Sequence, residues 1–368
     1  MRVLVTGGAG YVGHKLVPAL LRDGHTVVVY DALYFKCRLP PHQNMVIVCG
    51  DIRDITPLAE AMVACDAVIH LACISNDPSF ELDESLSRTI NLEAFEPLVL
   101  AAKEVGVRRF VYCSTSSVYG VSDSPNVRED HPLVPLTLYN RYKGECEPLL
   151  LRHASDNFVC TIIRPSTICG YSLRQRLDLA VNILTNLAYN TGVITVYGGA
   201  QRRPNLHIDD MVDCYRLLLS APEERIQREI FNVGARNATI MELAELVRDL
   251  VEEFRAENLA EEQDQLVKIK VEPIQDERSY QVNSDKIADV LGFRPRFTVA
   301  DAVRDLCNAF YDGWLPRPME DDNYYNVRRM RTVWEEVYRN APPSEFDPSR
   351  GHLSEIDLQR IRGDTGAV

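Results

Sequence analysis

One glycine-rich segment near the N-terminus constrains the fold of this chain more than any other feature. Gly7, Gly10 and Gly13 follow a short β-branched run at residues 2–6 and precede a helical pattern at 11–23. Glycines at this spacing allow a tight turn and let backbone N–H groups approach a pyrophosphate at the helix N-terminus. A plain tight turn explains many glycine patterns, so the flanking strand and helix are what favour a dinucleotide-binding loop here.

Two aspartates stand where the next two strands are expected to end. Asp31 follows the β-branched run 26–30 and lies 18 residues beyond the last loop glycine. A carboxylate there accepts both hydroxyls of a ribose and repels a 2′-phosphate, so it favours NAD over NADP. Asp51 follows the run 45–49, and we expect it to accept from the adenine amino group while Ile52 packs on the ring. Asp51 could as easily cap a helix.

Short apolar runs alternate with longer helical patterns through the first half of the chain. This alternation predicts an α/β fold, a Rossmann-type doubly wound parallel sheet with crossover helices on both faces. The expected strands are Arg2–Thr6, Thr26–Tyr30, Met45–Cys49, Ala67–Leu71, Phe110–Ser114 and Val159–Arg164, with helices at 11–23 and 85–105 among them.

The alternation of apolar runs and helical patterns ends near residue 170, and Trp, Pro and charged residues dominate from 312 onward. The chain is therefore expected to have three parts. These are an NAD-binding domain at 1–170, a smaller and mainly substrate-binding lobe at 171–311 with some elements returning to the first domain, and a C-terminal extension at 312–368. The elements expected in the lobe are a strand at 194–197, a helix from the capping box Thr239-x-x-Glu242 through Phe254, a charged loop at 255–265, and helices capped by Ser284 or Asn283 and by Thr298. The end of the chain, around 363–366, is expected to be unstructured.

Composition argues against several classes of function. The 368 residues include 40 Lys and Arg against 53 Asp and Glu, a net charge of −13, with no long basic run. Such a chain is not expected to bind nucleic acid or a membrane surface. Apolar stretches are strand-sized and the first strand follows Met1 directly, so neither a membrane span nor a signal peptide is expected. Ten scattered cysteines, without a Cys-x-x-Cys pair or metal spacing, fit reduced thiols in the cytoplasm and no metal site.

Tyr139 and Lys143 lie four residues apart and therefore on one face of a predicted helix. A phenol, with a pKa of about 10, is a poor base at neutral pH, but a neighbouring ammonium and an oxidised nicotinamide favour the phenolate. The pair occurs by chance in many helices. It gains weight from the hydroxyl-rich run 114–117 at a strand end, which can bond the substrate oxygen that Tyr139 deprotonates. Some of those hydroxyls could instead cap a turn.

Together these motifs resemble the extended short-chain dehydrogenase/reductase family of nucleotide-sugar epimerases and dehydratases. The resemblance covers about residues 1–310 and rests on the glycine loop, Asp31, residues 66–72, the segment 115–120 and Tyr139-x-x-x-Lys143, in that order. It implies a catalytic triad of Thr115, Tyr139 and Lys143. The cofactor contacts then expected for NAD are Gly7, Gly10, Tyr11, Val12, Gly13, Asp31, Asp51, Ile52, Leu71, Ala72, Cys73, Asn91, Tyr139, Lys143 and Pro165.

The resemblance also implies a nucleotide-diphosphate sugar as substrate, whose diphosphate suits the bidentate geometry of arginine. Arg203 and Arg278 stand at the family's spacing for such arginines, and we expect them to bind it. The other expected substrate contacts are Ser75, Asn76, Ser116 and Asn182. Arg174 and Arg176 are either phosphate ligands or part of a solvated helix face. His70 and His207 are expected to be buried near strand ends without a chemical role.

Differences from the family's subgroups bear on the reaction. In the family's 4,6-dehydratases, Asp-Glu directly follows the catalytic Thr, and in its UDP-glucuronate decarboxylases the pattern at this place is Thr-Ser-Glu. This chain has Ser116-Ser117 after Thr115. Serine supplies neither an acid of low pKa nor a strong base, which favours a 4-epimerase. The alternatives are a 4-keto nucleotide-sugar reductase or dehydratase, or a dinucleotide-sensing regulator without turnover. The resemblance further implies polysaccharide biosynthesis and a homodimer formed through the helices at 85–105 and 139–153.

Overall fold

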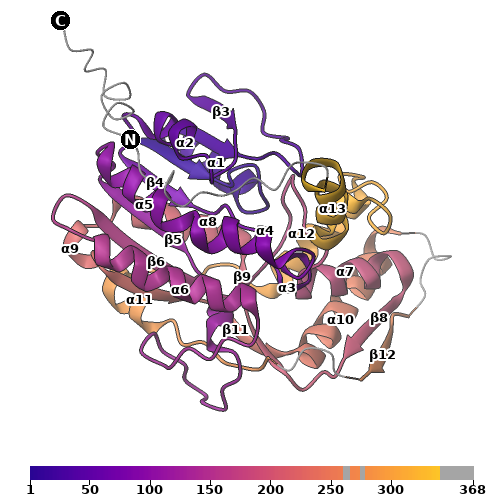
Figure 1. Ribbon diagram of the computed structural model, residues 1–368. Coiled ribbons are helices and arrows are strands. Elements are labelled where there is room, and N and C mark those ends of the chain that lie inside the picture. Colours follow the sequence, from indigo (N-terminus) through magenta and orange to yellow (C-terminus); the bar gives the residue numbers. More distant parts are fainter. Residues whose placement is uncertain (260–265, 274–277, 340–368) are drawn as a thin grey trace, which may run out of the picture.

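A parallel sheet of seven strands forms the centre of the molecule. The computed structural model describes residues 1–259, 266–273 and 278–339 (Figure 1). The strands are β1 (Arg2–Thr6), β2 (Thr26–Asp31), β3 (Met45–Cys49), β4 (Ala67–His70), β5 (Arg109–Cys113), β6 (Val159–Pro165) and β10 (Glu229–Val233). Their order is β10-β6-β5-β4-β1-β2-β3, and all neighbours run parallel. The predicted doubly wound sheet is confirmed, and the chain reverses its direction of winding between β1 and β4, where such sheets bind ligands.

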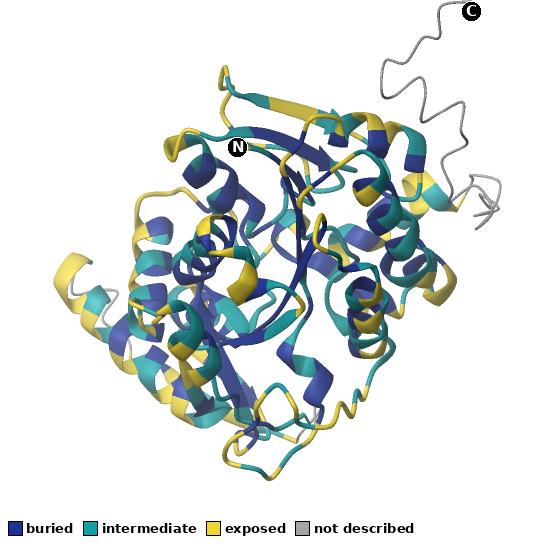
Figure 2. Ribbon diagram, turned by 90° about the vertical axis from the view of Figure 1, so that its left-hand side faces the viewer, coloured by how far each residue is buried: buried dark blue, intermediate teal, exposed yellow. Residues whose placement is uncertain are grey.

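Helices cover both faces of this sheet, which is why its strands are apolar on both sides. They are α1 (Gly13–Arg22), α2 (Ile55–Met62), α3 (Asp77–Phe80), α4 (Glu84–Arg88), α5 (Phe95–Glu104), α6 (Leu138–His153), α8 (Ile208–Ser220) and α9 (Glu223–Ile226). Leu4 of β1 belongs to a core packed against α2, α5 and α6, while Val3 and Val5 belong to a second core packed against α1 and α8. Figure 2 shows the central strands buried and the outer helix faces exposed.

The smaller lobe contains two short sheets and a helical layer. Its strands are β7 (Thr167–Cys169), β8 (Val193–Tyr197), β9 (Arg202–His207), β11 (Arg236–Thr239) and β12 (Lys268–Glu272), paired as β11-β9-β7 and β12-β8. Its helices are α7 (Ala180–Thr191), α10 (Ile240–Asn258) and α12 (Val299–Tyr311), whereas α11 (Asp285–Leu291) packs against β10 in the core of the first domain. Thr239 forms the predicted capping box, and Thr298, expected to cap its helix, does so in a capping box with Asp301.

Three local predictions need correction. The helix α10 continues to Asn258, because Arg255 donates to the carbonyls of Ala188 and Tyr189 instead of lying in a loop; residues 260–265 of that expected loop lie outside the described residues. At the start of α11, Ser284 stands at the cap position, but its hydroxyl accepts from Gly234 outside the helix and not from the helix itself. Asn283 accepts from the backbone of Asp285.

The third correction concerns the single helix expected at 85–105. It is instead α4, a π-helical turn at Thr89–Glu93 and α5. Within this turn, Asn91 bonds both the N–H and the carbonyl of Ile74. The wide turn therefore lies where the helix meets the loop that follows β4.

The C-terminal extension folds back onto the first domain, an arrangement that the sequence did not predict. Its elements are a 3₁₀ turn at Asp322–Tyr324, α13 (Asn326–Val333) and a π-helical turn at Trp334–Tyr338. Met330 and Val333 enter the core beside α2 and α5. The expected unstructured end at 363–366 lies outside the described residues. Among those that are described, no helix is long and apolar enough to cross a membrane.

Candidate active site

A cavity of about 670 Å³ lies at the carboxyl ends of the central strands. Its walls come from the loops after β1 to β6 on one side, and from the lobe and the C-terminal extension on the other. Every cofactor contact expected from the sequence lines this cavity except Asn91. The strand-end position is where open α/β sheets hold their ligands.

The glycine loop approaches its neighbours so closely that side chains are excluded. A Cβ on Gly7, whose φ is +70°, would lie 2.7 Å from the backbone nitrogen of Ala72, and a Cβ on Gly13 would lie 2.2 Å from the carbonyl oxygen of Gly8. Backbone therefore forms the floor of the cavity at the N-terminus of α1. This cradle fits the pyrophosphate of a dinucleotide.

The two strand-end aspartates differ in how their carboxylates are engaged. Asp31 accepts from the backbone N–H groups of Ala9 and Leu33, at 3.0 and 2.8 Å, and burial raises its pKa. Asp51 is held by Arg53, whose Nη2 lies 2.7 Å from its Oδ2. Ile52 lines the cavity beside them. The expected bond from Asp51 to an adenine amino group would thus share an oxygen with a guanidinium.

Thr115, Tyr139 and Lys143 all line this cavity. The cap of α6, Thr137, accepts from Asn140 and fixes the start of the helix that carries Tyr139 and Lys143. Lys143 Nζ donates to the carbonyl of Cys113 at 2.7 Å, which places the ammonium at the end of β5. Thr115 Oγ1 accepts from the backbone of Ser117 at 3.1 Å, so its hydroxyl proton is available to a substrate oxygen.

The surroundings of Tyr139 favour the protonated form of its phenol, although the positive charge of Arg176 acts against this. Burial raises the pKa of Tyr139 well above its usual value, and Cys73, Cys113 and Asp77 act in the same direction. Lys143 and an oxidised nicotinamide are the cations that can offset this in the loaded site. The geometry therefore supports a proton transfer at Tyr139 that depends on the bound cofactor.

The pattern of motifs and the cavity have a counterpart in known proteins. A family model described as the NAD dependent epimerase/dehydratase family matches residues 3–234. The chain belongs to that family. It is therefore an enzyme, and the expected cofactor, NAD, is confirmed.

Relatives and solved structures include both reactions of the family name. The chain is 30% identical to a dTDP-glucose 4,6-dehydratase of Streptomyces griseus, covering 82% of this chain and 91% of that protein. It is 27% identical to a UDP-glucose 4-epimerase of Lactobacillus helveticus, covering 67% and 82%. The structure of DesIV, a dTDP-glucose 4,6-dehydratase from Streptomyces venezuelae with NAD bound, matches with a TM-score of 0.74 at 25% identity, covering 89% of this chain and 100% of that one.

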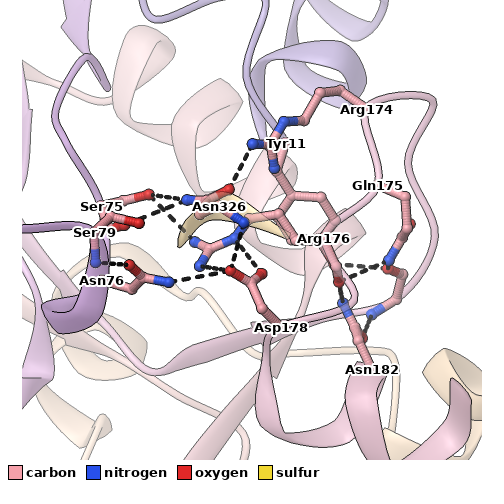
Figure 3. A network of polar contacts seen from close by, with 11 residues as sticks. Tyr11, Ser75, Asn76, Ser79, Arg174, Gln175, Arg176, Asp178, Asn182 and Asn326 are labelled. Atoms are coloured by element: carbon pink, nitrogen blue, oxygen red, sulfur yellow. Dashed lines mark hydrogen bonds and ion pairs between the residues drawn. The ribbon is translucent and has the colours of Figure 1, made fainter. Parts of the chain in front are cut away.

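Two further carboxylates of the cavity, those of Asp77 and Asp178, are held in ion pairs. Arg278 Nη1 lies 2.8 Å from Asp77, and Arg176 Nε lies 2.9 Å from Asp178. Burial alone would raise the pKa of Asp178, but its pair with Arg176 and its bond from the backbone of Asn326 hold that pKa below its usual value. Figure 3 shows Asp178 at the centre of this network.

Six residues were expected to contact the substrate, and four of them line the cavity. Arg203, Arg278, Ser75 and Asn76 do so. Ser75 Oγ accepts from Asn326 at 2.7 Å, and Asn76 Nδ2 donates to Asp178 at 3.1 Å.

Three expected contacts point elsewhere. The side-chain amide of Asn91 forms hydrogen bonds with the backbone of Ile74, as described above. Ser116 is buried beside Tyr280, and it is Ser117 that lines the cavity. Asn182 is fully buried, where it accepts from Gly170 and donates to the hydroxyl of Tyr11 and the carbonyl of Arg176. Their amide and hydroxyl groups are satisfied within the protein, so these residues support the walls.

Both histidines singled out from the sequence are buried, as expected. His70 bonds Thr6 Oγ1 at 2.7 Å, and burial lowers its pKa to about 3, so it stays neutral. His207 lies outside the cavity lining, with ring nitrogens 3.9 Å from Asp209 and 3.4 Å from Asp305. The ligand atoms of these three residues lie within 4.8 Å of one another, and Asp209 also pairs with Lys15.

Sequence reasoning missed the contribution of residues 325–330. Tyr325, Asn326, Arg328 and Met330 line the cavity from the C-terminal extension. It also left Arg174 undecided, and the structure places that side chain in the cavity wall with only 6% of its surface exposed, not on a solvated helix. A polar segment with no motif gives no signal that it returns across the chain to the first domain.

Proposed function

We propose that this protein is an NAD-dependent nucleotide-sugar epimerase that acts at carbon 4 of the sugar. The observation that carries the proposal is the meeting of Thr115, Tyr139 and Lys143 in one cavity with the glycine cradle, without a free carboxylate beside them in the described part of the chain. This set can move a proton on and off a hydroxyl, and the neighbouring carboxylates of Asp77 and Asp178 are held in ion pairs with arginines.

In the proposed reaction, Tyr139 takes the proton of the sugar hydroxyl while Thr115 holds the same oxygen. Lys143, fixed by the carbonyl of Cys113, favours the phenolate form of Tyr139. Held at the glycine loop and Asp31, NAD would supply the acceptor and donor of the hydride. The configuration would invert because the keto sugar turns its other face to the cofactor before the hydride returns. Tyr139 then gives the proton back to the oxygen, so the residues end the cycle as they began it.

A dehydratase is the second candidate, because several relatives carry that name. Elimination of water needs an acid and a base besides Tyr139. Ser116 and Ser117 replace the Asp-Glu pair typical of such enzymes, and Asp77 and Asp178 are paired with Arg278 and Arg176. These observations favour the epimerase. A 4-keto-sugar reductase would use the same three catalytic residues.

The substrate we propose is a sugar linked to a nucleoside diphosphate. Arg203 and Arg278 line the end of the cavity contributed by the lobe, where guanidinium groups suit a diphosphate. Related proteins are named for UDP- and dTDP-linked sugars. One relative, of Haloferax volcanii, is named for glycan biosynthesis, which is consistent with a role in polysaccharide assembly.

We also propose a homodimer that pairs α5 and α6 with their copies, in a cytoplasmic setting. The two helices pack side by side on one face of the sheet (Figure 1). All ten cysteines are unpaired, which fits a reducing compartment. Light scattering at working concentration tests the assembly, and a monomeric mass would contradict it.

The reaction is tested by offering UDP-, GDP- and dTDP-sugars to the NAD-loaded protein and identifying products by NMR. An inverted configuration at carbon 4, with no net loss of water and no net change in NAD, supports the epimerase. A 4-keto-6-deoxy sugar would show the dehydratase, and lasting absorbance of reduced nicotinamide would show an oxidoreductase. Binding of NAD without conversion of any sugar would favour the regulator.

A further inference from the structure

Arg174 is a buried cation with two unused hydrogen-bond donors. Its Nη2 donates to Asn326 Oδ1 at 2.6 Å, and its guanidinium lies 3.8 Å from the ring centre of Phe35. Its Nε and Nη1 are buried and have no hydrogen-bond partner among the described residues. Burial, with help from Arg176, lowers the pKa of Arg174 to about 9, which leaves it charged at neutral pH.

Other buried arginines of this protein are used differently. Arg109 donates to the carbonyls of Leu218, Leu219 and Ala221, and Arg164 forms an ion pair with Glu147 at 2.6 Å. These two side chains are saturated by the protein itself, as buried charges normally are. An arginine that only supports the fold is expected to resemble them. Arg174 does not, which indicates that its remaining donors serve a ligand.

The position of Arg174 shows which part of a ligand it would meet. It lines the same cavity as the glycine loop, and it lies next to Tyr11 in Figure 3. Its charge is felt by Asp31 at the end of β2 and by His14 in the first turn of α1. The guanidinium therefore lies near both the first turn of α1 and the carboxylate of Asp31. In a dinucleotide fold, the pyrophosphate lies between these two features.

We propose that Arg174 binds the pyrophosphate of NAD through Nε and Nη1, and that Asn326 is a positioning residue that aims it. Nε shares one edge of the planar guanidinium with Nη2, as in the pair of Arg164 with Glu147, and Nη1 lies on the other side. The two open donors therefore suit two separate oxygens of a pyrophosphate, and the unpaired positive charge strengthens both bonds. Asn326 is itself fixed, because its Nδ2 donates to Ser75 Oγ and its backbone N–H to Asp178. Two elements far apart in sequence, the loop after β7 and α13, thus complete the cofactor site.

Two other phosphate groups have weaker claims to this side chain. A 2′-phosphate of NADP would have to lie beside the carboxylate of Asp31. The diphosphate of the substrate has Arg203 and Arg278 at the other end of the cavity. Since all three ligands share the chemistry of a phosphate, the experiment must separate them by their nucleotides.

The first test compares Arg174→Met with the wild type by calorimetric titration and thermal melting. Without ligand, the variant should melt at the same temperature or higher, because an unsatisfied buried charge is gone. Its affinity for NAD, ADP-ribose and ADP should fall about 10- to 100-fold, the worth of a charged hydrogen-bond pair. Its affinity for UDP should not change. Arg174→Lys, which keeps the charge but not the fork, should fall between the two.

Arg109→Met is the matched control, since it removes a saturated buried arginine far from the cavity lining. It should lower the melting temperature of the free protein and leave ADP affinity unchanged. The proposal is overturned if Arg174→Met behaves like this control, or if it weakens UDP as much as ADP. Selective loss of NADP binding, with NAD binding intact, would overturn it too.

The positioning role of Asn326 needs a double-mutant cycle. Asn326→Ala should weaken ADP binding by about 3- to 10-fold in the wild type and have no further effect in the Arg174→Met background. Additive losses in the two backgrounds would show that Asn326 does not act through Arg174. None of these measurements requires turnover, so they stand apart from the proposed epimerase reaction.

Discussion

The two walls of the cavity contribute different things. The sheet wall, formed by the loops after β1 to β6, carries the proposed reacting groups Thr115, Tyr139 and Lys143 on a strand end and a helix. The arginine wall, formed by the lobe and the C-terminal extension, carries the guanidinium groups of Arg174, Arg176, Arg203, Arg278 and Arg328. The proposed proton transfer thus lies on the sheet wall together with the glycine loop, whereas the arginines proposed for the substrate diphosphate lie on the other wall. Changes in the sheet wall should mainly alter turnover, and changes in the arginine wall should mainly alter affinity.

The largest expected effect tests the sheet wall. Tyr139→Phe keeps the ring and its edge contact with Phe80, so the protein should fold and bind NAD about as before. Turnover should fall by roughly 10²–10⁴-fold, the usual worth of a positioned acid or base. Steady-state kinetics with the substrate found by NMR, alongside a titration with NAD, measures both quantities.

Lys143→Ala gives the matched comparison for that experiment. It should also lower turnover, but with weaker NAD binding, because we expect its ammonium to bond the nicotinamide ribose as well. If Tyr139→Phe retains nearly full activity, the assignment fails at its centre, and Tyr142 or Tyr119 would be the next residue to test.

A second prediction concerns the ribose end of the sheet wall. The carboxylate of Asp31 faces the place of a 2′-phosphate, and like charges brought together in a partly buried site cost several kcal/mol, so NAD should bind about 100-fold more tightly than NADP. Asp31→Asn should reduce the ratio of NAD affinity to NADP affinity. Titrations of both cofactors measure it. Comparable affinities in the wild type would mean that Arg174 opposite outweighs Asp31.

A third and smaller effect tests the arginine wall at the substrate end. Arg203→Met should raise KM for the nucleotide sugar about 10- to 100-fold and leave kcat within a few-fold, because a diphosphate is held equally before and during the reaction. Arg202→Met is the control, because Arg202 precedes Arg203 in the chain but does not line the cavity. A fall in kcat without a change in KM would place Arg203 at the reaction instead.

The sheet wall could be predicted from the sequence because its parts are local. A strand, a turn and a helix fix the glycine loop, and each later strand end places one short segment at the same edge of the sheet. Tyr139 and Lys143 need only the geometry of one helix. Even here, the sequence cannot decide between Ser116 and Ser117. Both hydroxyls bond that of Tyr280, but Ser116 is buried and only Ser117 also lines the cavity.

The arginine wall could be predicted only in part, because its members meet through tertiary packing. Asn326 lies 152 residues from the guanidinium that it bonds, and no local pattern links them. Asn182 resembles a phosphate ligand in sequence, yet its amide is consumed by Tyr11 and Gly170. Pairing of this kind depends on which side chains the tertiary packing brings within bonding distance of a buried donor. The spacing of residues along the chain does not indicate this.

The smallest prediction uses acid to separate the two walls. His70, buried at the end of β4 behind the sheet wall, has a folded pKa of about 3 because burial disfavours its charged form, whereas an unfolded histidine titrates near 6.5. Between these values the unfolded chain binds the extra proton, so stability rises with pH, and is lost as the pH falls below about 6.5. From pH 7.5 to 5.5 this residue should contribute about 1.4 kcal/mol of that loss. The arginines stay charged throughout, so ADP affinity per folded molecule should hardly change. Denaturant unfolding of the wild type and of His70→Gln at both pH values isolates the term, because other histidines contribute equally to both proteins. An equal pH dependence in the two would mean that His70 is protonated in the folded state, and that the sheet wall holds a positive charge beside Lys143.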